Sequence, residues 1–289
     1  MTESYANPDV LVSTEWVAEH LDDPTVAVVE VNTDLKEDYH TGHVPGAVGW
    51  SLHVDLEDLV KRDIPGVVQI EALMSRSGIE RGTTVVLYGD GNNRSATWPF
   101  WVLKIYRHPD VRIMNGGRAK WVSEGRPLSP ELSFRRTTDY RPAAPDRSLR
   151  AMKEYVAENL GRDGFKPLDT RSYEEFAGEL TSAPGTPQPD IYRKGRIPGA
   201  VHVPWDDGAA EDGSFLPASE LRRMYEGQGL SPDDEVVPYC RLGVRASYSW
   251  FVLKYLLGYS RVRNYDGSWT EWGNATGVPV ETGPPGARP

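Results

Sequence analysis

The chain contains one ten-residue pattern twice, and this repeat limits the folds that it can adopt. The segment YHTGHVPGAV at 39–48 returns as YRKGRIPGAV at 192–201, 153 positions later. Self-similarity over such a period indicates two copies of one domain, and 289 residues are enough to build two hydrophobic cores. Later landmarks repeat at almost the same spacing: Tyr88 and Tyr239, Gly116 and Gly267, Trp121 and Trp272, and Pro127 and Pro279.

The chain between the two copies is rich in proline, which disfavours a helix there. We therefore place the domains at 1–128 and 150–289, joined by a linker at 129–149. Within each copy, short β-branched runs alternate with helical patterns, which is typical of an α/β fold with a mostly parallel sheet flanked by helices. In the second copy the patterns predict strands at 166–169, 201–203, 236–239 and 262–264, and helices at 218–226 and 246–257.

Cys240 is the only cysteine of the chain, and it separates an apolar run from a helical pattern. A strand end followed by a helix start would surround the thiol with unpaired backbone amides and the positive end of a helix dipole. Arg241 and Arg245 add positive charge, so the thiolate is favoured over the thiol. The alternative, an inert packing cysteine, needs no such cationic turn. We predict that Cys240 is a catalytic nucleophile.

The residues after Cys240 are expected to form an active-site loop that holds an anion on the sulfur, and Gly243 would let this loop curl. Its members are Arg241, Leu242, Gly243, Val244 and Arg245. Asp169 lies at the carboxyl end of a predicted strand and is expected to brace the loop rather than to act as an acid. Arg245 either binds oxygens of the substrate or pairs with Asp169, and the sequence leaves both roles open.

Two motifs resemble the signatures of the two-domain rhodaneses, the family of thiosulfate and mercaptopyruvate sulfurtransferases. The segment VRNYDGSWTEW at 262–272 matches the C-terminal signature, and HVPGA at 43–47 matches the N-terminal one, although Trp50 departs from the usual residue. The resemblance covers nearly the whole chain. It implies two tandem rhodanese-like domains, of which only the second is catalytic, because the first-domain counterpart of Cys240 is Gly89 or Asp90.

The resemblance also implies the reaction. Such an enzyme moves sulfane sulfur from thiosulfate to cyanide or a thiol through a persulfide, here on Cys240, with no metal and no organic cofactor. Arg241 matches the basic residue of thiosulfate-type loops, whereas Leu242 departs from the expected lysine, so mercaptopyruvate stays open as the donor. A cysteine-dependent phosphatase is a weaker alternative, because four residues separate Cys240 from Arg245 and that class of loop has five.

The composition excludes some partners. A formal net charge of −10 disfavours nucleic acid and anionic membranes, and no apolar run approaches the length of a membrane-spanning helix. A single cysteine allows no internal disulfide, and we expect a soluble, cytoplasmic protein. His40 and His43 lie in the repeated turn, and we interpret them as residues of a surface turn rather than as metal ligands.

Overall fold

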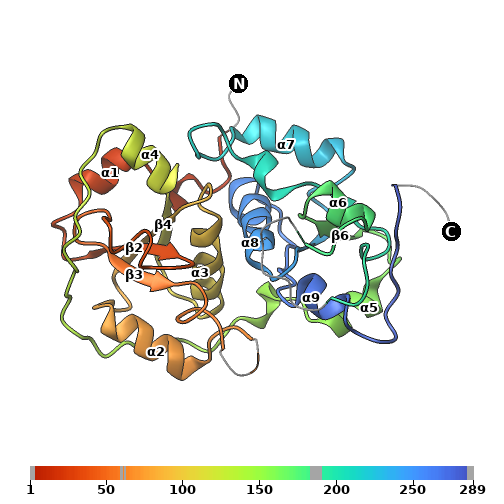
Figure 1. Ribbon diagram of the computed structural model, residues 1–289, viewed down its shortest axis with the longest axis horizontal. Coiled ribbons are helices and arrows are strands. Elements are labelled where there is room, and N and C mark those ends of the chain that lie inside the picture. The colour runs from red at the N-terminus through yellow and green to blue at the C-terminus, as the bar shows by residue number, and fades with distance from the viewer. Residues whose placement is uncertain (1–3, 59–60, 62, 183–190, 285–289) are drawn as a thin grey trace. The chain divides into compact units, whose positions relative to one another are not determined.

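The computed structural model describes residues 4–58, 61, 63–182 and 191–284, which form two compact units (Figure 1). The amino-terminal unit consists of Pro8–Arg147 and Ala209–Phe215. The carboxy-terminal unit consists of Ser148–Gly208, the chain from Leu216 onward and the residues before Pro8. Each unit therefore includes one short segment that its place in the sequence would assign to the other, and the repeat did not predict this exchange.

Backbone hydrogen bonds explain both exchanged segments. In the carboxy-terminal unit, the Ala6 N–H donates to the Leu256 carbonyl at 2.8 Å, and the Asn7 N–H donates to the Tyr255 carbonyl at 3.1 Å. In the amino-terminal unit, the Phe215 N–H donates to Asn115 Oδ1 at 3.0 Å. These bonds satisfy backbone groups that would otherwise lose their partners on burial.

The amino-terminal unit is built on a five-stranded parallel sheet with the order β1-β5-β4-β2-β3. All seven residues of β2 are buried, as expected for a strand that is covered by helices on both faces. In the view of Figure 1, α1 and α4 lie above the sheet and α2 lies below it. The elements are η1 (Pro8–Val10), β1 (Leu11–Val12), α1 (Thr14–Glu19), β2 (Val26–Asn32), β3 (Val48–Ser51), α2 (Val67–Arg76), β4 (Thr84–Gly89), α3 (Arg94–Ile105), β5 (Val111–Met114) and α4 (Gly117–Ser123).

The carboxy-terminal unit has a three-stranded parallel sheet with the order β7-β6-β8. The strand predicted at 262–264 is present only as two single parallel bridges, Val236 with Val262 and Arg150 with Asn264. The helix predicted at 246–257 begins earlier, at Val244, and its last turn is π-helical. The elements are η2 (Arg147–Leu149), α5 (Lys153–Asn159), β6 (Phe165–Asp169), α6 (Tyr173–Ala177), β7 (Val201–His202), η3 (Trp205–Gly208), α7 (Ala218–Gly227), β8 (Glu235–Tyr239), α8 (Val244–Phe251), η4 (Val252–Leu256) and α9 (Ser268–Trp272).

Parallel strands with covering helices in both units confirm the predicted α/β class. The repeat also has a physical basis in two buried tyrosines. The Tyr88 hydroxyl accepts from the Val44 N–H at 2.9 Å and donates to Glu30. In the second copy, the Tyr239 hydroxyl accepts from the Ile197 N–H at 3.1 Å and donates to Asp169 at 2.7 Å.

The repeated turn is less exposed than its polar residues suggested. His43 is completely buried, and its ring stacks on Tyr39 with centroids 3.8 Å apart. Its Nδ1 pairs with the Tyr39 carbonyl at 2.7 Å, and its Nε2 pairs with the Glu131 carbonyl at 3.1 Å. The interpretation of His43 as a surface residue was therefore wrong, because the linker backbone at Ser129 and Glu131 pairs with His43 and covers the turn. His40 is exposed, as expected.

Candidate functional site

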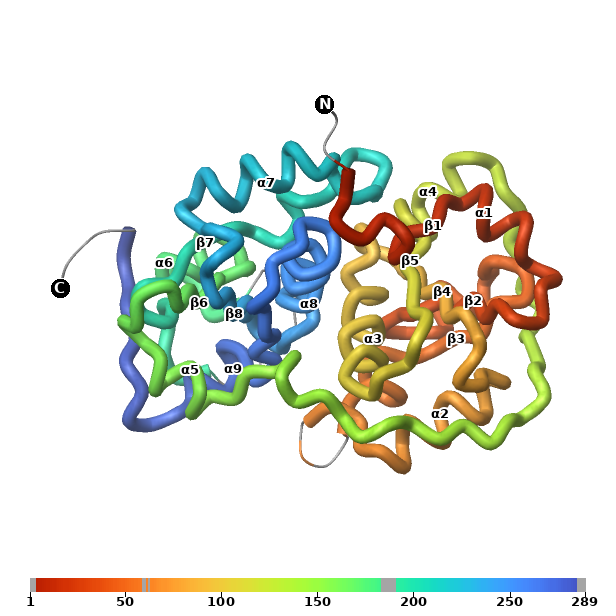
Figure 2. Tube along the Cα trace, turned by 180° about the vertical axis from the view of Figure 1, so that it is seen from behind, coloured from red at the N-terminus to blue at the C-terminus, as the bar shows by residue number. Residues whose placement is uncertain are grey.

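Cys240 directly follows the last residue of β8 and precedes the turn into α8. Figure 2 labels both elements in the carboxy-terminal unit. The Cys240 side chain is almost completely buried, with 1 % of its surface exposed. The N-cap of α8 is Gly243, whose φ of 91° is in the left-handed region that glycine adopts without strain. This turn brings the Gly243 N–H to 3.1 Å from Cys240 Sγ. The sulfur therefore accepts a backbone hydrogen bond at the start of a helix, as the sequence predicted for an anion-binding loop.

The start of α9 holds the outer side of the same loop. The Trp269 N–H donates to the Cys240 carbonyl at 2.9 Å, and the Thr270 N–H donates to the Arg241 carbonyl at 3.1 Å. The Thr270 hydroxyl donates to the same Arg241 carbonyl at 2.8 Å. Ser268 Oγ accepts from the Cys240 N–H at 3.0 Å and donates to the Tyr265 carbonyl at 2.8 Å. The sequence analysis did not single out Ser268 or Thr270.

Arg245 is placed in the first turn of α8 and pairs with Glu175, a residue that the sequence analysis did not consider. Its two terminal nitrogens reach the two Glu175 oxygens at 2.8 and 2.9 Å. Glu175 is held in turn by a capping box with Ser172 at the start of α6. Burial opposes the charge of Arg245, but the Glu175 hydrogen bonds and then the charge of Cys240 outweigh it and raise the pKa of Arg245. The guanidinium therefore keeps its positive charge.

The alternative pairing of Arg245 with Asp169 is wrong, because another arginine occupies that carboxylate. Arg171 donates to Asp169 from Nε at 2.9 Å and from Nη2 at 2.6 Å, and all of these side-chain atoms are buried. Burial opposes the charge of Arg171, but Asp169 outweighs this effect and raises the pKa of Arg171. Asp169 also accepts from the hydroxyl of Tyr239, the residue before Cys240. Any bracing by Asp169 therefore acts through the end of β8.

The remaining loop residues differ in exposure. Arg241 is buried, with 6 % of its surface exposed, while Leu242 and Val244 are half-buried. Val244 and Arg245 belong to α8 rather than to the loop, so the loop itself is shorter than the sequence suggested.

The first-domain counterpart of Cys240 is Gly89. Pairing with β2 places Glu30 opposite Tyr88, as pairing with β6 places Asp169 opposite Tyr239, so the residues that follow correspond without a gap. A Cβ at Gly89 would lie 2.1 Å from Ser95 Oγ and 2.5 Å from the Val31 carbonyl oxygen. The position has no room for any side chain.

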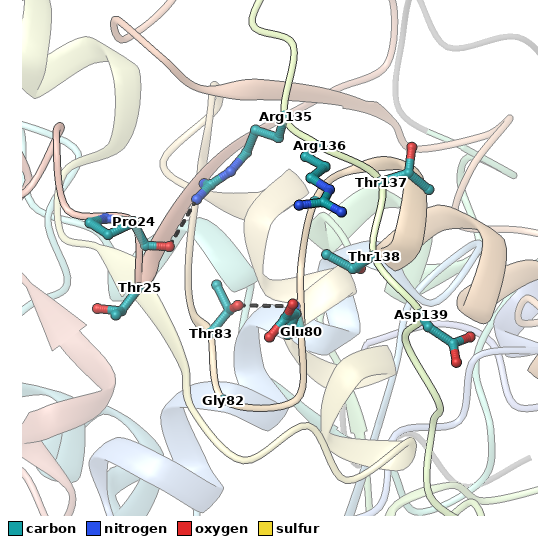
Figure 3. A pocket seen from close by; sticks show the side chains of 11 residues that line it. Pro24, Thr25, Glu80, Gly82, Thr83, Arg135, Arg136, Thr137, Thr138 and Asp139 are labelled. Atoms are coloured by element: carbon teal, nitrogen blue, oxygen red, sulfur yellow. Dashed lines mark hydrogen bonds between the residues drawn. The ribbon is translucent and has the colours of Figure 1, made fainter.

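A cavity of 720 Å³ lies elsewhere, within the amino-terminal unit (Figure 3). Most of its lining residues are polar or charged, and Arg136 of the linker lies above the turn that carries Glu80 and Thr83. Arg135 points instead toward Pro24, whose carbonyl accepts from its Nη2 at 3.3 Å. Arg135 is occupied with backbone, since it donates to the Val26 carbonyl at 2.8 Å. None of the residues around Cys240 lines this cavity, so it is separate from the candidate site.

The described residues hold neither a helix that could cross a membrane nor a cluster of metal-binding side chains. Across 4–58, 61, 63–182 and 191–284, no helix is long and apolar enough to cross a membrane. The same part of the chain holds no group of three or more histidine, cysteine, aspartate or glutamate side chains arranged to bind a metal ion.

Comparison with known families decides the assignment. The model of the rhodanese-like domain matches twice, at residues 13–124 and 152–275. The chain belongs to the rhodanese family. The predicted tandem of two rhodanese-like domains is thereby confirmed, and the chain is a member of the sulfurtransferases.

Relatives resemble this rhodanese over their full length. It is 50 % identical over 282 residues to the sulfur carrier protein TtuD of Thermus thermophilus, covering 96 % of this chain and 99 % of that protein. It is 43 % identical over 278 residues to a Mycolicibacterium smegmatis protein named "Putative thiosulfate sulfurtransferase", covering 96 % and 99 % of the two chains. A solved structure of EanB, with ergothioneine covalently linked to a persulfide cysteine, superposes with a TM-score of 0.86 at 26 % identity, covering 98 % of this chain and 72 % of that one.

Proposed function

We propose that this rhodanese is a thiosulfate sulfurtransferase, which moves sulfane sulfur to cyanide or a thiol through a persulfide on Cys240. The observation that carries this proposal is the hydrogen bond of 3.1 Å from the Gly243 N–H to Cys240 Sγ. A backbone donor at the sulfur stabilises its anionic form more than its neutral form. The dipole of α8 acts in the same direction.

The reaction balances without an external oxidant or reductant. The Cys240 thiolate attacks the outer sulfur of thiosulfate, a new S–S bond forms, and the old S–S bond breaks as sulfite leaves with its electron pair. The persulfide anion then occupies the loop, where backbone amides stabilise its charge. An acceptor such as cyanide attacks the terminal sulfur, thiocyanate leaves, and the Cys240 thiolate is restored.

Charge around the sulfur supports thiosulfate as the donor. Arg241 follows the nucleophile directly and adds a positive charge for a dianionic substrate. Both terminal nitrogens of Arg245 are bound to Glu175, so Arg245 is not free to bind a substrate carboxylate at two points. It contributes a positive electrostatic potential instead. Mercaptopyruvate is the second candidate donor, since the same nucleophile would attack its sulfur. A higher kcat/KM for mercaptopyruvate than for thiosulfate would make mercaptopyruvate the preferred donor.

The ion pair between Arg245 and Glu175 also disfavours a cysteine-dependent phosphatase. Such an enzyme needs an arginine fork on the phosphate oxygens, whereas Arg245 uses both terminal nitrogens on Glu175. The loop is also short, because α8 begins at Val244. We therefore assign Cys240 to sulfur transfer.

The relatives bear on the acceptor. The name of the Thermus relative, a sulfur carrier, favours a thiol acceptor of the cell over cyanide. A reactive thiolate persists in a reducing compartment, so we place the protein in the cytoplasm.

Mass spectrometry tests the proposal. Excess thiosulfate without acceptor should make the protein one sulfur atom heavier, on the peptide that contains Cys240. Cyanide should then restore the original mass and release thiocyanate. Cys240→Ser should do neither, because an alkoxide is not accessible near neutral pH. Sulfur transfer by this variant, or phosphate release by the wild type without any gain of mass, would refute the assignment.

A further inference from the structure

The outer side of the Cys240 loop is held by three consecutive residues, Ser268, Trp269 and Thr270, which we call the loop clamp. Two backbone N–H groups and one hydroxyl of the clamp donate hydrogen bonds to the carbonyls of Cys240 and Arg241. The Ser268 hydroxyl oxygen also accepts a hydrogen bond from the Cys240 N–H. The clamp and the loop are 28 residues apart in sequence, so this contact is purely tertiary.

The clamp fixes the direction of the loop amides. The described chain contains no cis peptide, and in a planar trans peptide the N–H points opposite to the carbonyl. With the Cys240 and Arg241 carbonyls turned toward α9, the N–H groups of Arg241 and Leu242 must point away from α9. The inner side of the loop, where the Gly243 N–H already meets Cys240 Sγ, is the side left for them.

The hydroxyl side chains of the clamp are present only in the domain that has the cysteine. With the repeat spacing of 151, Ser268 corresponds to Gly117 and Thr270 corresponds to Ala119. Both hydroxyls are therefore missing from the copy that has no cysteine. In that copy the Gly89 N–H donates instead to Asn93 Oδ1 at 3.2 Å. Asn93 is the N-cap of α3, so the acceptor of this amide belongs to the loop itself and not to a distant helix.

Ser268 also occupies a backbone conformation that does not suit serine. Its φ is 53°, in the left-handed region, while Gly117 has a φ of 57° at the equivalent position. Glycine would be the unstrained choice, as in the first domain. A buried serine held in this conformation indicates that its hydroxyl is needed.

We propose that Ser268 and Thr270 are positioning residues of the persulfide site, which orient the amides of the Cys240 loop toward the sulfur. The inference rests on the proposed function of Cys240, since it concerns the same sulfur. Their hydrogen bonds go to the Cys240 and Arg241 backbone, so both residues act through that backbone. Without the two hydroxyls, the loop loses two of its four hydrogen bonds to the clamp. The loop amides are then directed toward the sulfur in a smaller fraction of the molecules.

The test compares variants that delete a hydroxyl with variants that keep it. Thr270→Val removes the hydroxyl at nearly constant volume and leaves the backbone N–H, while Thr270→Ser keeps the hydroxyl. Ser268→Gly introduces the first-domain residue and relieves the backbone strain. The matched control is Ser13→Ala, which removes a helix-capping hydroxyl from α1, far from Cys240 in the chain.

Two readouts separate positioning from stability. The first is the rate of Cys240 alkylation by iodoacetamide against pH, and the second is the rate of persulfide formation with thiosulfate. In Thr270→Val and Ser268→Gly, we expect alkylation and persulfide formation near neutral pH both to slow by about threefold or more, because fewer amides stabilise the charge on the sulfur. Thr270→Ser and Ser13→Ala should match the wild type in both, although Ser13→Ala lowers the melting temperature.

The outcomes are distinct. Wild-type alkylation profiles and persulfide rates in both Thr270→Val and Ser268→Gly would overturn the proposal, whatever their melting temperatures. Shifted alkylation profiles in these variants, with a wild type that gains no sulfur from thiosulfate, would uphold the clamp and refute the proposed function instead. If Ser268→Gly does not fold, Thr270→Val, at a half-buried position, decides alone.

Discussion

Glu175→Gln removes one charge from the ion pair with Arg245 and keeps the volume of the side chain. The Glu175 side chain is 0 % exposed and that of Arg245 is 15 % exposed. Deleting one partner of a fully buried ion pair costs about 3–5 kcal/mol, because the remaining charge is uncompensated. Glutamine still accepts one hydrogen bond and Arg245 has some contact with water, so we expect the free energy of unfolding to fall by about 2 kcal/mol.

Calorimetry measures this loss. For a domain of this size, 1 kcal/mol corresponds to roughly 3–5 °C, so the melting temperature should fall by roughly 6–10 °C. The control is Glu175→Gln combined with Arg245→Met, which removes the charge that was left unpaired and keeps an apolar stem. This double variant should be less destabilised than the sum of the two single variants, because the pair acts as a unit.

Two results would refute the reasoning. One is a Glu175→Gln protein that melts within about a degree of the wild type, which is far less than the cost of an unpaired buried charge. The other is simple additivity in the double variant, since additive effects mean that the two side chains do not interact in the folded protein.

Three further predictions concern the donor, the arginine and one buried histidine. With the same acceptor and pH, thiosulfate should give a higher kcat/KM than mercaptopyruvate, and the reverse order would remove the donor role of Arg241. Arg245→Lys should lower sulfur transfer by about tenfold, roughly 1.4 kcal/mol, because lysine cannot reproduce the two-point bond to Glu175; wild-type turnover would contradict this. Burial lowers the pKa of His108 to about 4, below the value of about 6.5 in an unfolded chain. The stability that the neutral ring provides is thus complete above pH 6.5 or so and is lost as the pH falls toward 4, by about 2 kcal/mol near pH 5. The melting temperature of His108→Asn should therefore fall less between about pH 7 and 5 than that of the wild type, and parallel curves would show that another group titrates.

The repeat and the local patterns predicted the fold because both depend on residues close in sequence. The buried tyrosines Tyr88 and Tyr239 kept their spacing because each ties a strand end to the repeated turn of its own domain. The strand at 262–264 was overestimated, since only Val262 of its three residues is β-branched and the segment makes only single bridges. Local patterns report the tendency to be extended and not the presence of a partner strand.

The site was predictable only as far as its parts adjoin Cys240. Gly243 lies three residues after the cysteine, and its turn follows from glycine and the helix start. Glu175 lies 70 residues from Arg245, and a capping-box glutamate carries no sign that its carboxylate also faces another helix. Ser268 and Thr270 did leave a signal, because the first copy has glycine and alanine at these positions. Their contact with the loop still required the tertiary structure.

The crowding at Gly89 means that no single replacement can fit a cysteine at the first-domain position that corresponds to Cys240. A cysteine there would place its Cβ 2.5 Å from the Val31 carbonyl oxygen, and this atom belongs to the backbone, so no exchange of side chains can remove it. Trimming Ser95 would clear only one of the two clashes. An engineer who wants a rhodanese with two working thiols would have to rebuild the strand end and the helix start together. No single substitution therefore places a thiol at Gly89 without a shift of the Val31 backbone.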